Sequence, residues 1–324
     1  MFEGSHAVAH GHHHHHHHHH HVDPEAGDRR VIAAVVVNLG LTIAQIIGGI
    51  LSGSLALIAD ALHNFSDAIS LLIAFAARKI ARRPRDATMT FGYGRAETVA
   101  ALINYTTLIL IGLYLLYEAG ARFLDPQPVE GWLIVIVAGI ALVVDLVTAM
   151  LTFAMSKTSM NIRAAFLHNV ADALGSVAVI VAGVLILLFG WWVVDPILTV
   201  LIAGYILWQS IREIGPVMRV LMLGSPPEIE TEAVLQAVRD TEGVSGIHHA
   251  HFWQMTEARA SLDAHVVIEE GAWTRADAVK AAIKARLRDT FGIDHSTLEL
   301  ECARHACVEA TTFGGANRDA PGRT

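Results

Sequence analysis

Two short motifs in this chain place an aspartate four positions after a histidine. The first is His63-Asn-Phe-Ser-Asp67 and the second is His168-Asn-Val-Ala-Asp172. Residues four apart lie above one another on one face of an α-helix. Two such faces brought together would offer two imidazole nitrogens and two carboxylate oxygens, which is a complete tetrahedral set of ligands for Zn²⁺. The repeated motif therefore predicts a divalent-metal site shared by two helices.

Both motifs lie inside stretches that are apolar enough to cross a membrane. A lone histidine there would more often be a partner in an interhelical hydrogen bond. An aspartate is different, because a carboxylate in hydrocarbon must be neutralised by a proton or a cation. Metal ligands lose their protons when they bind a metal, so metal and protons compete for one set of ligands. The motifs therefore predict exchange of metal for protons.

The composition places much of the chain in lipid. It is 53% hydrophobic and 17% charged over 324 residues, whereas soluble domains are about 25% charged. Six apolar segments, numbered 1 to 6 in chain order, have about the 20 residues that a spanning helix needs: Val31–Leu51, Ser54–Ala77, Val99–Tyr117, Trp132–Phe153, Ala165–Leu188 and Trp192–Ile211. Short turns at Ser52-Gly53-Ser54 and at Gly190 predict that segments 1 and 2, and segments 5 and 6, form antiparallel hairpins.

Basic residues predict the orientation of these segments. They gather before segment 1, between segments 2 and 3, between segments 4 and 5, and after segment 6, while the opposite loops contain only Arg122. By the positive-inside rule, both termini are expected to be cytoplasmic. The sequence has no basic stripe, so nucleic acid is not expected as a partner.

After Pro216 the sequence changes to that of a soluble domain. The expected order αββαβ is that of a small ferredoxin-like α+β domain. The second helix is expected to bury Ala278, Ala281, Ala282 and Leu287 on one face. The elements are expected at Pro227–Thr241, Gly246–Gln254, Ala258–Glu269, Thr274–Phe291 and His295–Cys302.

Four regions follow from these patterns. We expect residues 1–29 to form a His-rich disordered N-terminus and 30–213 to form a transmembrane domain of six helices. We expect residues 214–309 to form the cytoplasmic domain and 310–324 to form a disordered tail. The run His12–His21 is either a native, low-affinity metal collector or a purification tag.

Taken together, these motifs resemble the cation diffusion facilitator family, in its zinc-type branch. The resemblance covers nearly all of the chain from Arg30 to Cys307. It implies a homodimer in the membrane that exports divalent metal from the cytoplasm in exchange for protons, by alternating access. The motifs that carry it are Ser54–His63, Phe91–Glu97, His168 to Val177, Asp195-Pro196-Ile197, Gly246–Trp253 and Ala264-His265.

The resemblance also implies roles for particular residues. The transport site would comprise His63, Asp67, His168 and Asp172, a set that resembles the zinc branch. Nitrogen ligands favour Zn²⁺, Co²⁺ or Cd²⁺ over Mn²⁺ and Mg²⁺. The compact loops suggest a multi-pass protein of the bacterial inner membrane.

Further polar residues are candidates for supporting roles. Asp60 could orient a ligand, carry protons, cap the start of segment 2 or bind the metal itself. Asp145, also at bilayer depth, could support the ligands or carry protons, or it could make a plain interhelical hydrogen bond. The resemblance places His248, His265 and Glu301 at positions that bind metal in the cytoplasmic domain. It thereby implies that Zn²⁺ is also a structural ligand of that domain. For each residue of the cytoplasmic set an ordinary strand or tail role stays open. Four further candidates in that domain are His249, His251, Cys302 and Cys307.

Two other functions could use the same ligands. A membrane metalloenzyme would need an open coordination position and a general base, and neither histidine motif has the HExxH spacing of such zinc hydrolases. A metal sensor would signal through the soluble domain, but no nucleotide-binding or DNA-binding motif is present to receive the signal. The sequence therefore favours a transporter over an enzyme.

Overall fold

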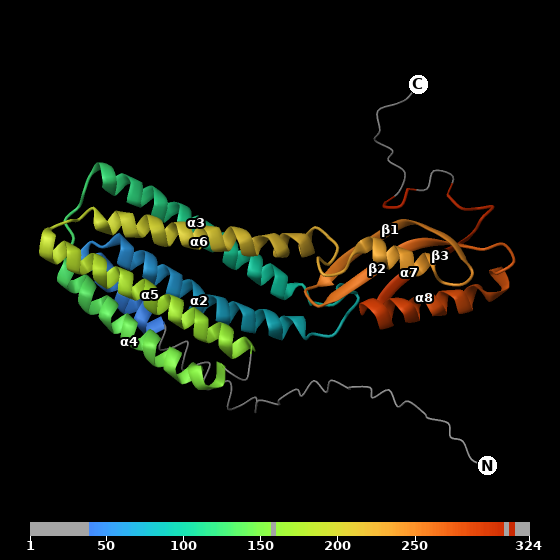
Figure 1. Ribbon diagram of the computed structural model, residues 1–324, viewed down its shortest axis with the longest axis horizontal. Helices are drawn as coiled ribbons and strands as arrows, with labels where there is room; N and C mark the ends of the chain where they lie inside the picture. Colours follow the sequence, from blue (N-terminus) through green and yellow to red (C-terminus); the bar gives the residue numbers. More distant parts are fainter. Residues whose placement is uncertain (1–38, 157–159, 308–310, 315–324) are drawn as a thin grey trace, which may run out of the picture.

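The computed structural model describes residues 39–156, 160–307 and 311–314. Long helices lie together at one end of the elongated molecule, and a small sheet with two helices lies at the other (Figure 1). The described residues contain five helices that are long and apolar enough to cross a membrane. The group of long apolar helices and the α+β domain confirm the fold class expected from the sequence.

The five long helices have the following bounds, together with a shorter apolar helix at Leu39–Ser52. They are α2 at Leu55–Ala81, α3 at Ala96–Leu124, α4 at Gly131–Ser156, α5 at Met160–Phe189 and α6 at Val194–Leu221. The expected start of the first segment, Val31, lies outside the described residues. Helix α6 continues through Pro216 to Leu221, beyond the expected end at Ile211.

Apolar side chains on these helices remain uncovered by protein. Leu110 of α3, Met150 of α4 and Leu188 of α5 are 64%, 67% and 71% exposed. An apolar surface of this extent is unfavourable in water but is the normal outer surface of helices in lipid. The exposed side chains therefore agree with a multi-pass membrane protein.

The long helices pack as two pairs, α4 with α5 and α3 with α6, as Figure 1 shows. Small residues allow the first pair to approach: a Cβ added at Gly131 would lie 2.6 Å from the Gly183 carbonyl oxygen. Helices α5 and α6 are joined by a short turn at Gly190 and contact each other, as the predicted hairpin requires. Each of the two helices nevertheless packs mainly against another partner.

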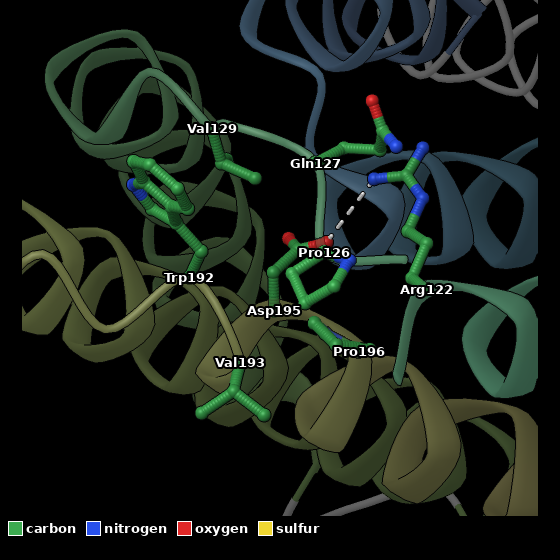
Figure 2. Close-up of a pocket in the computed structure, with 8 residues that line it drawn as sticks. All are labelled: Arg122, Pro126, Gln127, Val129, Trp192, Val193, Asp195 and Pro196. Atoms are coloured by element: carbon green, nitrogen blue, oxygen red, sulfur yellow. Dashed lines mark ion pairs between the residues drawn. The ribbon is translucent and has the colours of Figure 1, made fainter. Parts of the chain in front are cut away.

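A buried carboxylate ties the start of α2 to α6. Asp195, which is 1% exposed, accepts hydrogen bonds from Ser54 Oγ at 2.5 Å, Leu55 N at 2.8 Å and Ala56 N at 3.3 Å. Arg122 at the end of α3 lies 3.6 Å from Asp195 (Figure 2). Arg122 also donates to the Gly53 carbonyl. The negative charge lies where the helix N-terminus is positive. This clamp fixes where α2 begins, and with it the orientation of His63 and Asp67.

The small domain has the predicted order αββαβ. Its elements are α7 (Thr231–Arg239), β1 (Val244–Thr256), β2 (Arg259–Ile268), α8 (Ala276–Phe291) and β3 (His295–Cys302), with a 3₁₀ turn at Trp273–Arg275. The sheet order is β1-β2-β3; β1 is antiparallel to β2, and β2 is parallel to β3. One apolar core lies between the sheet and the two helices.

The predicted buried face of the second helix was largely wrong. In α8 the buried residues are Val279, Ile283 and Leu287. The three alanines of the expected face are exposed. The larger aliphatic side chains bury more apolar area than alanine does, and they recur every four residues on one face.

The loop between α2 and α3 contacts the small domain. Arg95 donates to the carbonyl oxygens of Met255 at 3.1 Å and Gln254 at 3.4 Å. The Phe91 ring meets the His295 ring edge-on, with their centroids 6.1 Å apart. The helices and the small domain are therefore joined by a second contact besides the chain itself.

Candidate metal centres

The first candidate centre lies between α2 and α5. His63 Nε2 is 3.7 Å from Asp67 Oδ2 and 3.7 Å from Asp172 Oδ1. One ligand atom from each of these three residues lies within 4.8 Å of the others. The side chains of His63, Asp67 and Asp172 are 17%, 29% and 12% exposed. Three donors expected from the two sequence motifs therefore converge.

The fourth expected ligand, His168, belongs to α5 and precedes Asp172 by one helical turn. Its side chain lies outside the described part of the structure. The backbone alone puts the two residues four apart in one helix, which is the spacing of His63 and Asp67 in α2.

A hydrogen-bond network of neutral amides supports the first centre. Gln45, which is fully buried, donates from Nε2 to Asp60 Oδ2 at 2.6 Å. Its carbonyl accepts from Asn64 Nδ2 at 3.1 Å, and Asn64 is the neighbour of His63. The network links the helix Leu39–Ser52 to α2. Gln45 was not predicted, although a glutamine in an otherwise apolar segment was a usable signal.

The other predicted supporting residue, Asp145 of α4, is 7% exposed. It accepts a hydrogen bond from Ser176 Oγ of α5 at 3.1 Å. Asp60 also faces α5, because a Cβ added at Gly175 would lie 3.6 Å from Asp60 Oδ1. Asp60 and Asp145 are thus both buried and both turned toward the helix that carries Asp172.

The second candidate centre lies on the sheet of the small domain. His248 of β1 is paired in register with His265 of β2, and Glu301 of β3 lies beside them. His265 Nδ1 is 2.6 Å from Glu301 Oε1, and His248 Nε2 is 3.2 Å from Glu301 Oε2. One ligand atom from each of His248, His265, Glu301 and Cys307 lies within 4.8 Å of the others.

Three other candidates of the small domain do not belong to this group. The His249 ring stacks on the His265 ring, with centroids 4.7 Å apart, and the His251 ring lies 5.3 Å from that of His249. Cys302 Sγ lies 3.0 Å from His305 Nδ1 instead. Among the described residues, the four-residue group therefore excludes His249, His251 and Cys302.

The surroundings shift three pKa values in this domain. Burial opposes the charge on Glu301, but the hydrogen bond with His265 and the nearby His248 hold its pKa below the ordinary value. The hydrogen bond with His305 lowers the pKa of Cys302. Burial and the neighbouring Glu301 raise the pKa of Cys307.

A pocket beside the Asp195 clamp is too small to be a ligand site. Figure 2 shows its lining around Arg122 and Asp195, at the end of the helices far from the sheet. Its volume of about 10 Å³ is barely enough for one water molecule.

Two family models match the chain. Residues 31–222 match the cation efflux transmembrane domain, and residues 226–302 match the cytoplasmic domain of cation efflux proteins. The two matches cover the helices and the small α+β domain, which contain the first and second centres respectively.

Curated relatives match along most of their length. The zinc transporter ZitB of Pectobacterium atrosepticum is 37% identical, over 86% of this chain and 88% of its own. The cadmium, cobalt and zinc/H(+)-K(+) antiporter of Bacillus velezensis is 36% identical, over 85% and 88%. The metal cation efflux system protein CzcD of Cupriavidus metallidurans is 34% identical, over 86% and 88%.

A solved structure is also similar, the metal-bound C-terminal domain of the CzcD transporter. It is 33% identical and covers 22% of this chain and 99% of its own, with a TM-score of 0.21.

Proposed function

Because the chain belongs to the cation efflux family, we propose that it exports Zn²⁺, or a chemically similar divalent ion, in exchange for protons. It is a multi-pass membrane protein and a transporter, not an enzyme. The relatives are named for zinc, cadmium, cobalt and proton transport. Those names support the same class of cargo here.

The observation that carries the proposal is the convergence of His63, Asp67 and Asp172 between α2 and α5. We propose that these three residues and His168 are the four ligands of the transported ion. Mixed nitrogen and oxygen donors suit Zn²⁺, Co²⁺ and Cd²⁺ better than the hard ions Mg²⁺ and Ca²⁺. Partial exposure of the three described side chains fits a site that must load and release its cargo.

Proton exchange follows from the chemistry of these ligands. Histidine and carboxylate must be deprotonated to bind the ion, so metal entry displaces protons and protonation from the other side favours metal release. Imidazole titrates near neutral pH, where this competition is effective. The proposed cycle exposes the ligand cluster alternately to the two sides of the membrane.

We propose supporting roles for Asp60 and Asp145. Both are nearly buried and face α5, and Asp60 is held by the amide of Gln45. They either accept a proton during exchange or orient the ligand-bearing helices. Hydrogen-bonded groups behind metal ligands tune affinity by about 10-fold to 100-fold.

The oligomer and the topology are also proposals. The match of residues 226–302 to a cytoplasmic domain whose family model is named for dimerisation supports a homodimer. Both termini and the small domain are placed in the cytoplasm, on the basis of the distribution of basic residues. The bacterial relatives support the inner membrane as its location.

The test is zinc entry into liposomes that hold the protein and a trapped zinc dye, with a pH gradient imposed. Asp172→Asn keeps the size of the side chain but removes the charge. It is expected to lower the rate by at least ~100-fold, since a lost ligand costs more than a lost neighbour of a ligand. The matched control is Asp125→Asn, an exposed carboxylate of the same domain. Undiminished flux in Asp172→Asn would refute the site. Zinc binding without flux by the unaltered protein would favour a sensor.

A further inference from the structure

We propose that the thiolate of Cys307 is the fourth ligand of a metal site that also comprises His248, His265 and Glu301. The site lies in the small domain and does not share residues with the transport site. It would hold a resident ion rather than the transported one. The inference therefore stands or falls independently of the transport proposal.

The position of Cys307 is the first argument. Its Sγ lies 3.6 Å from Glu301 Oε1 and 3.9 Å from His265 Nδ1. Ligands about 2.0–2.3 Å from a common Zn²⁺ lie about 3.5 Å from one another. The four donor atoms, all within 4.8 Å, therefore need only small side-chain movements to surround an ion.

A buried polar atom at the same place is an independent argument. His248 is 7% exposed, and its Nε2 makes no hydrogen bond with any described residue, although Glu301 Oε2 lies 3.2 Å away. A buried nitrogen without a hydrogen bond is unfavourable, because it has lost its contacts with water and gained no partner. A metal ion bound to this nitrogen would remove that cost.

The orientation of His265 is a third argument. Its Nδ1 faces Glu301 and Cys307, while its Nε2 lies 3.3 Å from Glu299 Oε2. Histidines that bind metals usually donate their second ring N–H to a carboxylate, which fixes the tautomer and the ring. Glu299 is thus placed to act as a positioning residue, with Nδ1 left for the ion.

The path of the chain explains how a cysteine beyond β3 reaches a site on the sheet. After β3 the chain turns, with His305 N donating to the Cys302 carbonyl. Thr311 and Thr312 then accept hydrogen bonds from His249 N at 2.9 Å and Ala250 N at 3.0 Å of β1. Both ends of this segment are therefore anchored on the sheet, and Cys307 lies between them. His249 has a positive φ of 49° at the β1 irregularity where the segment attaches.

The donor set specifies the class of ion. A thiolate with two imidazoles and one carboxylate suits Zn²⁺, Cd²⁺ or Co²⁺ and disfavours Mg²⁺, Ca²⁺ and Mn²⁺. On binding, a sulfur–metal bond forms and the thiol proton passes to the solvent, with no change in oxidation state.

The experiment uses Co²⁺ as the probe and the full-length protein in detergent, under reducing conditions. A thiolate bound to Co²⁺ gives an intense sulfur-to-cobalt absorption band in the near ultraviolet, whereas histidine and carboxylate ligands do not. Only two cysteines exist in the chain. We expect the band in the unaltered protein and in Cys302→Ser, and its loss in Cys307→Ser and in His248→Ala.

The proposal is overturned if Cys307→Ser keeps the band, if Cys302→Ser loses it, or if the unaltered protein shows none. Because the transport site contains no sulfur, Asp172→Asn must keep the band even if transport is lost.

A second measurement does not depend on any variant folding. Zn²⁺ should protect Cys307, but not Cys302, from iodoacetamide, as followed by mass spectrometry of the unaltered protein. Equal protection or no protection of the two cysteines would contradict the assignment.

Discussion

At the scale of single residues, Cys302 and Cys307 have opposite surroundings although they are five positions apart. His305 lowers the pKa of the Cys302 thiol, whereas burial and Glu301 raise that of Cys307. The thiolate is the reactive form, so in the absence of metal iodoacetamide should modify Cys302 faster than Cys307 at neutral pH. The ratio of the rates should fall as pH rises above both pKa values. Mass spectrometry of each labelled cysteine over time measures it.

The variant His305→Ala removes the cause of this difference. Cys302 should then react more slowly at neutral pH, while Cys307 should be unaffected. If Cys302 keeps its rate in His305→Ala, the hydrogen bond between Cys302 and His305 does not control the thiol.

Asp60 permits a second prediction at this scale. Asp60→Asn keeps an oxygen that can accept the hydrogen bond from Gln45 Nε2, which spans 2.6 Å to the native carboxylate. If Asp60 carries the exchanged proton and does not orient the ligands, zinc binding should fall by much less than the ~10-fold to 100-fold expected for an orienting residue, because the ligands remain. Flux should nevertheless lose its dependence on the pH gradient. Zinc binding by calorimetry and flux with and without a gradient measure the two effects; a large loss of binding would assign Asp60 to orienting the ligands.

At the scale of elements, the contact between α4 and α5 depends on glycine. A Cβ at Gly183 would lie 2.9 Å from Val135 Cγ2 and 3.1 Å from the Gly131 carbonyl oxygen. Gly183→Ala should therefore separate the helices and destabilise the membrane domain by about 1–3 kcal/mol. The matched control is Gly139→Ala, where nothing lies within 4 Å of the added atom. The thermal midpoint followed by tryptophan fluorescence should fall in the first variant only.

The Asp195 clamp predicts a graded loss of stability. Ser54→Ala removes the side-chain cap of Leu57 N and one donor to Asp195, which should cost about 1 kcal/mol. Asp195→Ala also leaves the largely buried Arg122 without its carboxylate at 3.6 Å, which should cost about 3–5 kcal/mol. The midpoint of thermal unfolding in detergent should fall in that order. Equal midpoints would show that the clamp does not stabilise α2.

The elements that were predicted well are those with a strong local pattern. The alternating residues of His295–Cys302 gave both ends of β3, and long apolar runs gave the helices. Interactions between residues that are distant in the sequence were harder to predict. Which helices pack as pairs depends on close approaches such as Gly131 to Gly183, and no single-segment pattern records these.

The candidate centres, too, were predictable only where their residues share a local spacing. The four-residue spacing in α2 and α5 pointed to the residues that converge at the first centre. The second centre depends on strand register and on the path of the chain after β3. Cys302 and Cys307 could not be distinguished from spacing alone, because the turn at His305 directs only Cys307 toward His265. Residues 311–314, which the sequence placed in a disordered tail, pair with β1.

At the scale of the whole molecule, the two centres lie in different parts. The first is in the long helices and the second is on the sheet, and the loop that contains Arg95 contacts the sheet. The first has nitrogen and oxygen donors, which suit an ion that must leave, whereas the second adds sulfur. We therefore expect the removal of Cys307 to leave the ligands of the transported ion intact.

Exchange of zinc for protons requires that the two compete for the cluster of His63, Asp67 and Asp172. The most direct test imposes a zinc gradient, without a pH gradient, on liposomes that contain the protein and a trapped pH dye. Potassium-free buffers leave protons as the counter-ion. Zinc entry should drive protons out, so that the interior becomes alkaline, and Asp172→Asn should abolish the change. Zinc entry without proton movement, or proton movement that persists in Asp172→Asn, would contradict it.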